Sequence, residues 1–227
     1  MNYHFAVLLG VAFSSWLLLD DSMQYLQRDL SSKIEQILFR FSAILTSVMA
    51  MQTYSDVVRS PILGIISVHP ILPRPLLQAI AIQRMKRSWV WLVSFLILLL
   101  PLWVMQQFPL VLLASALLCG SWIGGIGIGY AVNLASIWAA RSPKMTGILD
   151  IARGQNPREQ AAFIYAPGVA LVIVGLALAL AVGGIRAFIE GNAPLSLFLL
   201  LPYLLGGAGY ALALVLMEEE FLRVSSI

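Results

Sequence analysis

The stretch LVLLASALLCGSWIGGIGIGYAVNLASIWAA, residues 110–140, contains 31 residues and no charged side chain. About 20 apolar residues are enough for a helix to cross a bilayer, so this run is a predicted span that tilts or protrudes at one end. In the whole chain, 60% of residues are apolar and 11% are charged, against roughly 25% charged in soluble domains. The sequence therefore predicts an integral membrane protein rather than a soluble enzyme.

Further apolar runs lie on both sides of this stretch. They predict an all-α, polytopic membrane protein whose single transmembrane domain covers residues 1–227. Residues 1–5 contain no Lys or Arg, so the first apolar run is read as a retained span and not as a secretory signal. The six predicted spans are at about 3–19, 37–54, 89–105, 110–140, 161–185 and 195–217.

The positive charges predict the orientation of these spans. Ten of the 14 Lys and Arg residues lie in the loop after the second span, the loop after the fourth span, or the carboxyl-terminal tail. Because positive residues in short loops favour the cytoplasm, both termini are expected there, in the plasma (inner) membrane of the cell. The net charge of +3 follows from these loops and gives no reason to expect a nucleic-acid partner.

Residues that could carry chemistry are scarce. The chain lacks a P-loop, and the glycines between Gly120 and Gly129 have neither a preceding strand nor a lysine. His4 and His69 are the only histidines and Cys119 is the only cysteine, so no metal-ligand cluster is expected. We therefore expect no catalytic, cofactor-binding or metal-binding residues on this chain. Two sets of glycines are interpreted as sites of close helix packing: Gly120, Gly124, Gly125, Gly127 and Gly129, and in the last span Gly206, Gly207 and Gly209.

Polar residues within the predicted spans are few as well. The last four predicted spans have no charged residue in their apolar cores, so any energy for transport must come from a separate ATPase subunit. Asn133 is the most evident polar residue in this region, either as an interhelical hydrogen-bond partner or as part of a transport pathway. Tyr130 and Trp122 are the other pathway candidates, and each is also explained by simple packing or interfacial anchoring.

The loop at 56–88 is rich in proline and basic residues. Its part from Leu76 to Met85 contains no proline and is predicted to form a short amphipathic helix. Such an element could dock on an ATPase subunit, or it could lie on the membrane surface and be held by anionic lipid. Physical chemistry alone does not separate these two interpretations.

The sequence SVHPILPRPLLQAIAIQRMKRSW, residues 67–89, resembles the segment after the second span of type-two ABC exporter permeases. The resemblance implies six spans, cytoplasmic termini and a coupling helix that docks on an ATP-binding subunit, which would hold the ATP and Mg. It also implies a pathway shared with a second permease subunit, identical or different. The implied docking residues are Val68, His69, Pro70, Pro73, Arg74, Pro75, Leu76, Leu77 and Ile80. Near the same partner the resemblance places Arg141, Lys144, Arg153 and Arg158 of the second cytoplasmic loop.

Two other functional classes stay open from the residues alone. A secondary transporter or channel would need no ATPase, although the lack of charges within the spans argues against it. A membrane assembly subunit that transports nothing is equally compatible with the composition. The leading prediction is an ABC exporter permease subunit that is not itself an enzyme.

Overall fold

The computed structural model describes residues 30–57, 73–104, 107–141 and 157–225. Within these ranges every regular element is helical, which confirms the all-α prediction for the described residues. The elements are α2 (Leu30–Val57), α4 (Pro73–Ile97), α5 (Leu100–Val104), α6 (Phe108–Arg141), α8 (Pro157–Ile189), α9 (Ala193–Ser196), the 3-10 helix η2 (Leu197–Leu200) and α10 (Leu201–Ser225).

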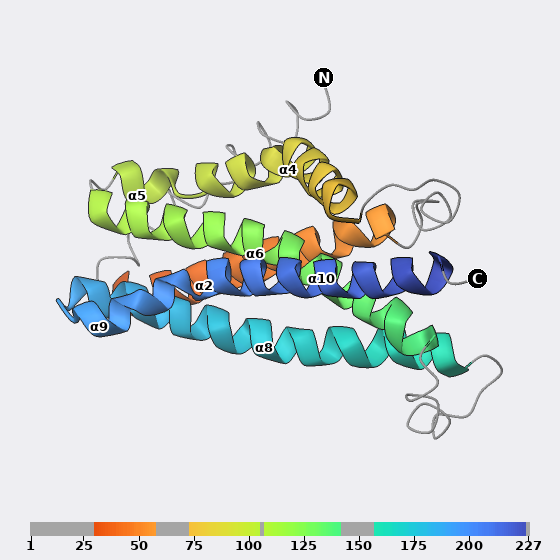
Figure 1. The fold of residues 1–227 in the computed structure, drawn as a ribbon. Helices are drawn as coiled ribbons and strands as arrows, with labels where there is room; N and C mark the ends of the chain where they lie inside the picture. Colours follow the sequence, from red (N-terminus) through yellow and green to blue (C-terminus); the bar gives the residue numbers. More distant parts are fainter. Residues whose placement is uncertain (1–29, 58–72, 105–106, 142–156, 226–227) are drawn as a thin grey trace.

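The long helices lie side by side in one bundle (Figure 1). Helices α2, α6 and α10 end, and α4 and α8 begin, at the same end of this bundle, on the right in Figure 1. Charged side chains lie near that end, among them Asp56, Arg74, Arg84, Lys86, Arg87 and Glu218. We call it the charged end.

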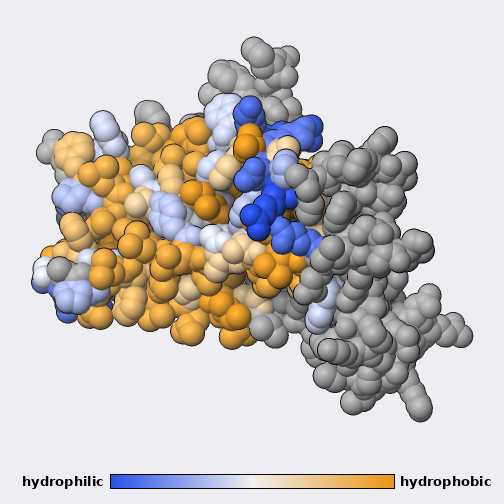
Figure 2. All heavy atoms as spheres, in the orientation of Figure 1, coloured by the Kyte–Doolittle hydropathy of each residue, from blue (hydrophilic) through white to orange (hydrophobic). Residues whose placement is uncertain are grey.

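Three helical segments are long and apolar enough to cross a membrane: Phe108–Ser136, Val172–Ile189 and Pro194–Glu218. They overlap the last three predicted spans. Many of their large apolar side chains are exposed, as Figure 2 shows for one face of the molecule, and an apolar exterior is suited to lipid rather than to water. The chain is therefore a membrane protein with three candidate spans among its described residues.

The other three predicted spans have different outcomes. The first, at 3–19, lies outside the described residues. The second, at 37–54, falls within α2, and the third, at 89–105, falls across α4 and α5. Neither α2 nor α4 is among the helices that meet the length and apolarity expected of a span, so the count of six stays a prediction.

Helix α4 differs from the short amphipathic helix that the sequence predicts. It runs without interruption for 25 residues and joins the predicted docking segment to the apolar residues after Arg87. Its two prolines, Pro73 and Pro75, lie in the first turn, where the missing N–H groups have no helical partner to lose. The helix ends at Ile97 because Pro101 has no N–H to donate to the Ile97 carbonyl.

Helix α6 lies in the middle of the bundle, and glycines on two of its faces allow its neighbours to approach closely. A Cβ atom added at Gly124 would lie 2.8 Å from the Pro202 carbonyl oxygen of α10. A Cβ atom at Gly125 would lie 2.6 Å from the Thr46 carbonyl oxygen of α2. Gly120 and Gly127 also face α10, and Gly129 faces α2. The interpretation of these glycines as packing residues is confirmed.

Two of the three glycines in α10 have the same role. Gly206 and Gly209 lie against Gly124 and Gly127 of α6. Gly207 differs, because a Cβ atom there would meet nothing within 4 Å. Where Gly124 and Gly127 face Gly206 and Gly209, the contact between α6 and α10 is therefore glycine against glycine.

Candidate functional site

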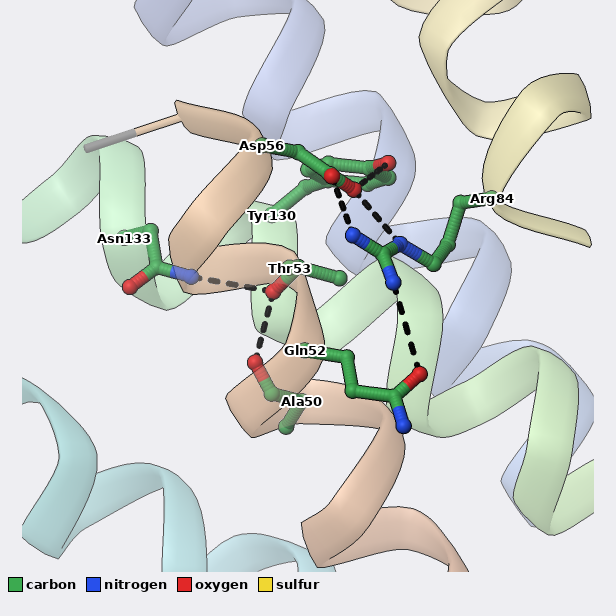
Figure 3. Close-up of polar contacts among 7 residues, drawn as sticks. All are labelled: Ala50, Gln52, Thr53, Asp56, Arg84, Tyr130 and Asn133. Atoms are coloured by element: carbon green, nitrogen blue, oxygen red, sulfur yellow. Dashed lines mark hydrogen bonds and ion pairs between the residues drawn. The ribbon is translucent and has the colours of Figure 1, made fainter. Parts of the chain in front are cut away.

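Three helices meet at a buried carboxylate near the charged end. Asp56, in the last turn of α2, accepts two hydrogen bonds from Arg84 of α4, one of them from Nε to Oδ2 at 2.6 Å and the other from Nη2 to Oδ1. The Tyr130 hydroxyl of α6 donates to the same Oδ2 at 3.1 Å. Figure 3 shows these side chains converging from three directions. We call Asp56, Arg84, Tyr130 and Gln52 the Asp56 cluster.

Little water reaches this cluster. The side chains of Arg84 and Asp56 are 11% and 16% exposed, and Tyr130 is fully buried. Gln52 accepts a further hydrogen bond from Nη1 of Arg84 at 3.4 Å. Burial by itself lowers the pKa of Arg84, but its hydrogen bond to Asp56 and the negative charge there raise it above the usual value. Opposite charges and several hydrogen bonds together make the buried pair tolerable.

A second polar contact between α2 and α6 lies beside the Asp56 cluster. Nδ2 of Asn133 donates to Thr53 Oγ1 at 2.9 Å and to the Gly129 carbonyl oxygen at 2.8 Å. The Thr53 hydroxyl donates in turn to the carbonyl oxygen of Ala50 at 2.6 Å. Asn133 thus forms the interhelical hydrogen bond that was one of its two predicted roles, and its role in a pathway stays a prediction.

The other two pathway candidates also contact neighbouring helices. Tyr130 belongs to the Asp56 cluster. Trp122 donates from Nε1 to the Ser88 hydroxyl of α4 at 3.0 Å, so that α6 is also hydrogen-bonded directly to α4. All three candidates therefore contribute to cohesion among α2, α4 and α6.

The structure separates the predicted docking residues into inward and outward sets. Leu77 is 1% exposed and belongs to the core, and Leu76 and Ile80 pack against that core. Arg74 and Pro75 are exposed, and Arg74 donates from Nε to Oε1 of Glu218 in α10 at 2.8 Å. The outward set is the one that a partner protein could contact.

The remaining predicted residues contribute less to the site. Val68, His69, Pro70, Lys144 and Arg153 lie outside the described residues. Pro73 begins α4, Arg141 ends α6, and Arg158 is the second residue of α8. Both of these helix ends lie at the charged end (Figure 1).

Sequence reasoning missed the Asp56 cluster. It assigned both Asp56 and Arg84 to a loop, because charged residues beside apolar runs usually face water. The available signal was the spacing in α4: Arg84 lies seven residues after the apolar Leu77, and thus on the same face of one helix. Both residues lie within the helix predicted from Leu76 to Met85, but sequence reasoning placed that helix in a loop at the surface rather than against the bundle.

An apolar groove lies between α6, α8 and α10. Its volume is about 360 Å³, and its lining includes Ala131, Ala135, Ile173, Ala208 and Leu212. The groove offers hydrocarbon a fitting surface and offers an ion no ligand. Among the described residues, no group of three His, Cys, Asp or Glu side chains could hold a metal ion.

Comparison with known proteins finds no matching family model, no matching curated protein and no matching solved structure. The Asp56 cluster, the exposed start of α4 and the apolar groove are therefore interpreted from their own geometry.

Proposed function

We propose that this chain is a membrane-spanning permease subunit of an ATP-driven ABC exporter, with ATP hydrolysis on a separate subunit. The proposal includes six spans, cytoplasmic termini and a location in the plasma (inner) membrane. It is supported by the resemblance of residues 67–89 to exporter permeases and by the gathering of basic residues in two loops and the tail. In this orientation the charged end faces the cytoplasm.

Helix α4 is the observation that carries the proposal. Its first turn is exposed at the charged end, and the same uninterrupted helix continues to Ile97. Through Arg84 it is hydrogen-bonded to α2, and through the shared Asp56 carboxylate it is joined to Tyr130 of α6. A force applied by a partner at the start of α4 would therefore reach two helices of the bundle without crossing a flexible joint.

The exposed face at the start of α4 defines where the ATPase would bind. Arg74, Pro75, Gln78 and Ala79 are exposed there. Leu77 lies between them and is buried, so it supports this face from beneath. The proposed contact therefore excludes Leu76, Leu77 and Ile80 and adds Gln78 and Ala79 to the outward residues predicted from sequence.

A second membrane subunit, identical or different, would complete the pathway. The outer face of α8 offers a surface for it, since Val172 and Leu176 are 73% and 63% exposed. On the same face Gly175, Ala179 and Gly183 recur at intervals of four residues, and a Cβ atom at either glycine would meet nothing within 4 Å. Small residues at this spacing allow close helix pairing in lipid.

Co-purification tests the proposal. The tagged chain, extracted in mild detergent, should bring down an ATP-binding protein whose hydrolysis of ATP can be measured in the eluate. Arg74→Ala combined with Gln78→Arg should reduce the recovered ATPase several-fold while leaving the thermal unfolding of the chain unchanged. Glu190→Gln, at the opposite end of the bundle, is the matched control and should retain the ATPase.

Two outcomes would contradict the proposal. If no ATP-binding protein accompanies the chain under conditions that preserve its fold, the chain is not such a subunit. If the ATPase is recovered equally with and without the two α4 substitutions, the docking face has been assigned wrongly.

A further inference from the structure

Lys86 and Arg87 of α4 have no carboxylate partner among the residues that the structure describes. Arg74 and Arg84 form ion pairs with Glu218 and Asp56. Lys86 and Arg87 are exposed, and neither forms an ion pair with any residue in the described part of the chain. Two adjacent cations that meet no counter-charge within the described part of the chain form a surface that is complementary to an anion.

These cations lie where α4 changes from polar to apolar. No charged residue occurs from Ser88 to Val104. Trp89 and Trp91, which follow directly, are 51% and 39% exposed. Exposed tryptophans are typical of the level of the lipid head groups, where the ring contacts hydrocarbon and its N–H contacts water.

The helix geometry pairs each cation with one of these tryptophans. Lys86 and Trp89 are three residues apart, and Arg87 and Trp91 are four apart, so each pair lies on one face. Side chains on a helix lean toward its amino terminus, and α4 begins at the charged end (Figure 1). The cations therefore extend toward water while the tryptophans lie deeper, and Figure 2 shows hydrophilic residues gathered at this edge of the apolar surface.

We propose that Lys86, Arg87, Trp89 and Trp91 form a binding site for the head-group phosphate of an anionic phospholipid in the leaflet at the charged end. The Arg87 guanidinium can hold two phosphate oxygens at once, and the Lys86 ammonium adds a point charge. Trp89 and Trp91 are two residues apart and lie on different sides of α4, so the ring on the occupied side contacts the glycerol and the upper acyl chain. An acidic protein is a poorer occupant, because the neighbouring surface is apolar and tryptophan-flanked. The site requires no ATPase partner.

Each cation near a membrane surface enriches anionic lipid by about fivefold. Two cations acting together should therefore favour an anionic over a zwitterionic lipid by about 25-fold at this position. Salt should weaken the preference, because these side chains are exposed.

Quenching of tryptophan fluorescence by brominated lipid tests the site directly. The full chain is reconstituted in phosphatidylcholine vesicles that contain a minority of brominated phosphatidylglycerol or, in parallel, brominated phosphatidylcholine. A variant that retains only Trp89 should be quenched more strongly by the brominated phosphatidylglycerol. A variant that retains only Trp103, which lies in α5 beyond the end of α4 and is 58% exposed, should be quenched equally by both.

Substitution then assigns the excess quenching to the cations. Lys86→Gln with Arg87→Gln should abolish the excess at Trp89, and Arg186→Gln at the opposite end of the bundle should preserve it. Equal quenching of Trp89 by the two lipids, or an excess that survives the double substitution, overturns the site.

Native mass spectrometry gives an independent measurement on the chain with all its tryptophans. The unaltered protein, released from mixed vesicles, should retain phosphatidylglycerol in preference to phosphatidylcholine, and the Lys86/Arg87 variant should lose that preference. Equal retention by the two proteins refutes the proposal even if the single-tryptophan variants do not fold.

Discussion

Removing one partner of the Asp56–Arg84 pair should destabilise the bundle strongly. In Asp56→Ala the guanidinium of Arg84, whose side chain is only 11% exposed, loses its carboxylate partner. Breaking a buried ion pair on one side costs about 3–5 kcal/mol, because an uncompensated charge remains in a poorly hydrated place. Arg84→Met should cost a similar amount, since it leaves the Asp56 carboxylate with the Tyr130 hydroxyl but without a cation.

The double variant separates the pair from its surroundings. Replacing both members of a buried pair by apolar residues is often neutral or nearly so. We therefore expect Asp56→Ala with Arg84→Met to be more stable than either single variant, with a coupling energy of about 2 kcal/mol or more. The free energy of unfolding can be measured by titration with sodium dodecyl sulfate in mixed micelles, with tryptophan fluorescence as the signal.

A control sets the scale of this measurement. Glu190→Gln breaks the Arg186–Glu190 pair, whose side chains are 64% and 59% exposed, and should leave the unfolding transition unchanged. If Asp56→Ala is no less stable than Glu190→Gln, the pair is not buried in the way described. If the effects of Asp56→Ala and Arg84→Met simply add, the two residues do not interact.

Other substitutions test the packing. Gly127→Ala places a methyl group on the Gly206 carbonyl and should destabilise the bundle by about 1–3 kcal/mol. Gly175→Ala meets open space and should stabilise the helix by up to about 1 kcal/mol. Equal effects of the two substitutions in thermal unfolding would contradict the close approach of α6 to α10. Asn133→Ala removes the hydrogen bond to Thr53 and should lower the stability of the bundle by about 1 kcal/mol. An unchanged thermal unfolding would show that this hydrogen bond does not stabilise the bundle. Leu77→Ala should lower stability by about 2–5 kcal/mol, as expected of a core residue. If the variant is as stable as the unaltered chain but recovers less ATPase, Leu77 contacts the ATPase and not the core. Ala179→Cys should form a disulfide-linked dimer in the membrane if the second subunit is an identical copy that pairs through α8; a chain that stays monomeric points to a different subunit or a different face.

The helical class and the last three spans could be predicted because they depend on composition over long windows. A run such as 110–140 has few ways to satisfy its backbone in lipid other than as a helix. The packing role of Gly124 and Gly125 was also within reach, since small residues in apolar helices usually mark contacts. Which helix each glycine contacts depends on the tertiary fold and could not be predicted from the spacing of the glycines alone.

The Asp56 cluster could not be predicted, for a physical reason. Asp56 and Arg84 are 28 residues apart, and each alone resembles a solvated loop residue. Their burial results from the packing of α4 against α2 and α6, which depends on the tertiary fold. The same packing turns Leu77 inward, so a residue predicted to contact another protein contacts its own core instead.

The glycine contacts of α6 also restrict how the bundle can move. Backbone lies against backbone on two sides of this helix, at Pro202 of α10 and at Thr46 of α2. At Pro202 and Thr46 the nearest contact atoms belong to the backbone, which cannot change rotamer to fill a gap, so opening either contact would leave a void. We therefore expect α2, α6 and α10 to move as one rigid body. Conformational change would then be confined to α8 and to the break between α4 and α5, where Pro101 interrupts the helical hydrogen bonds.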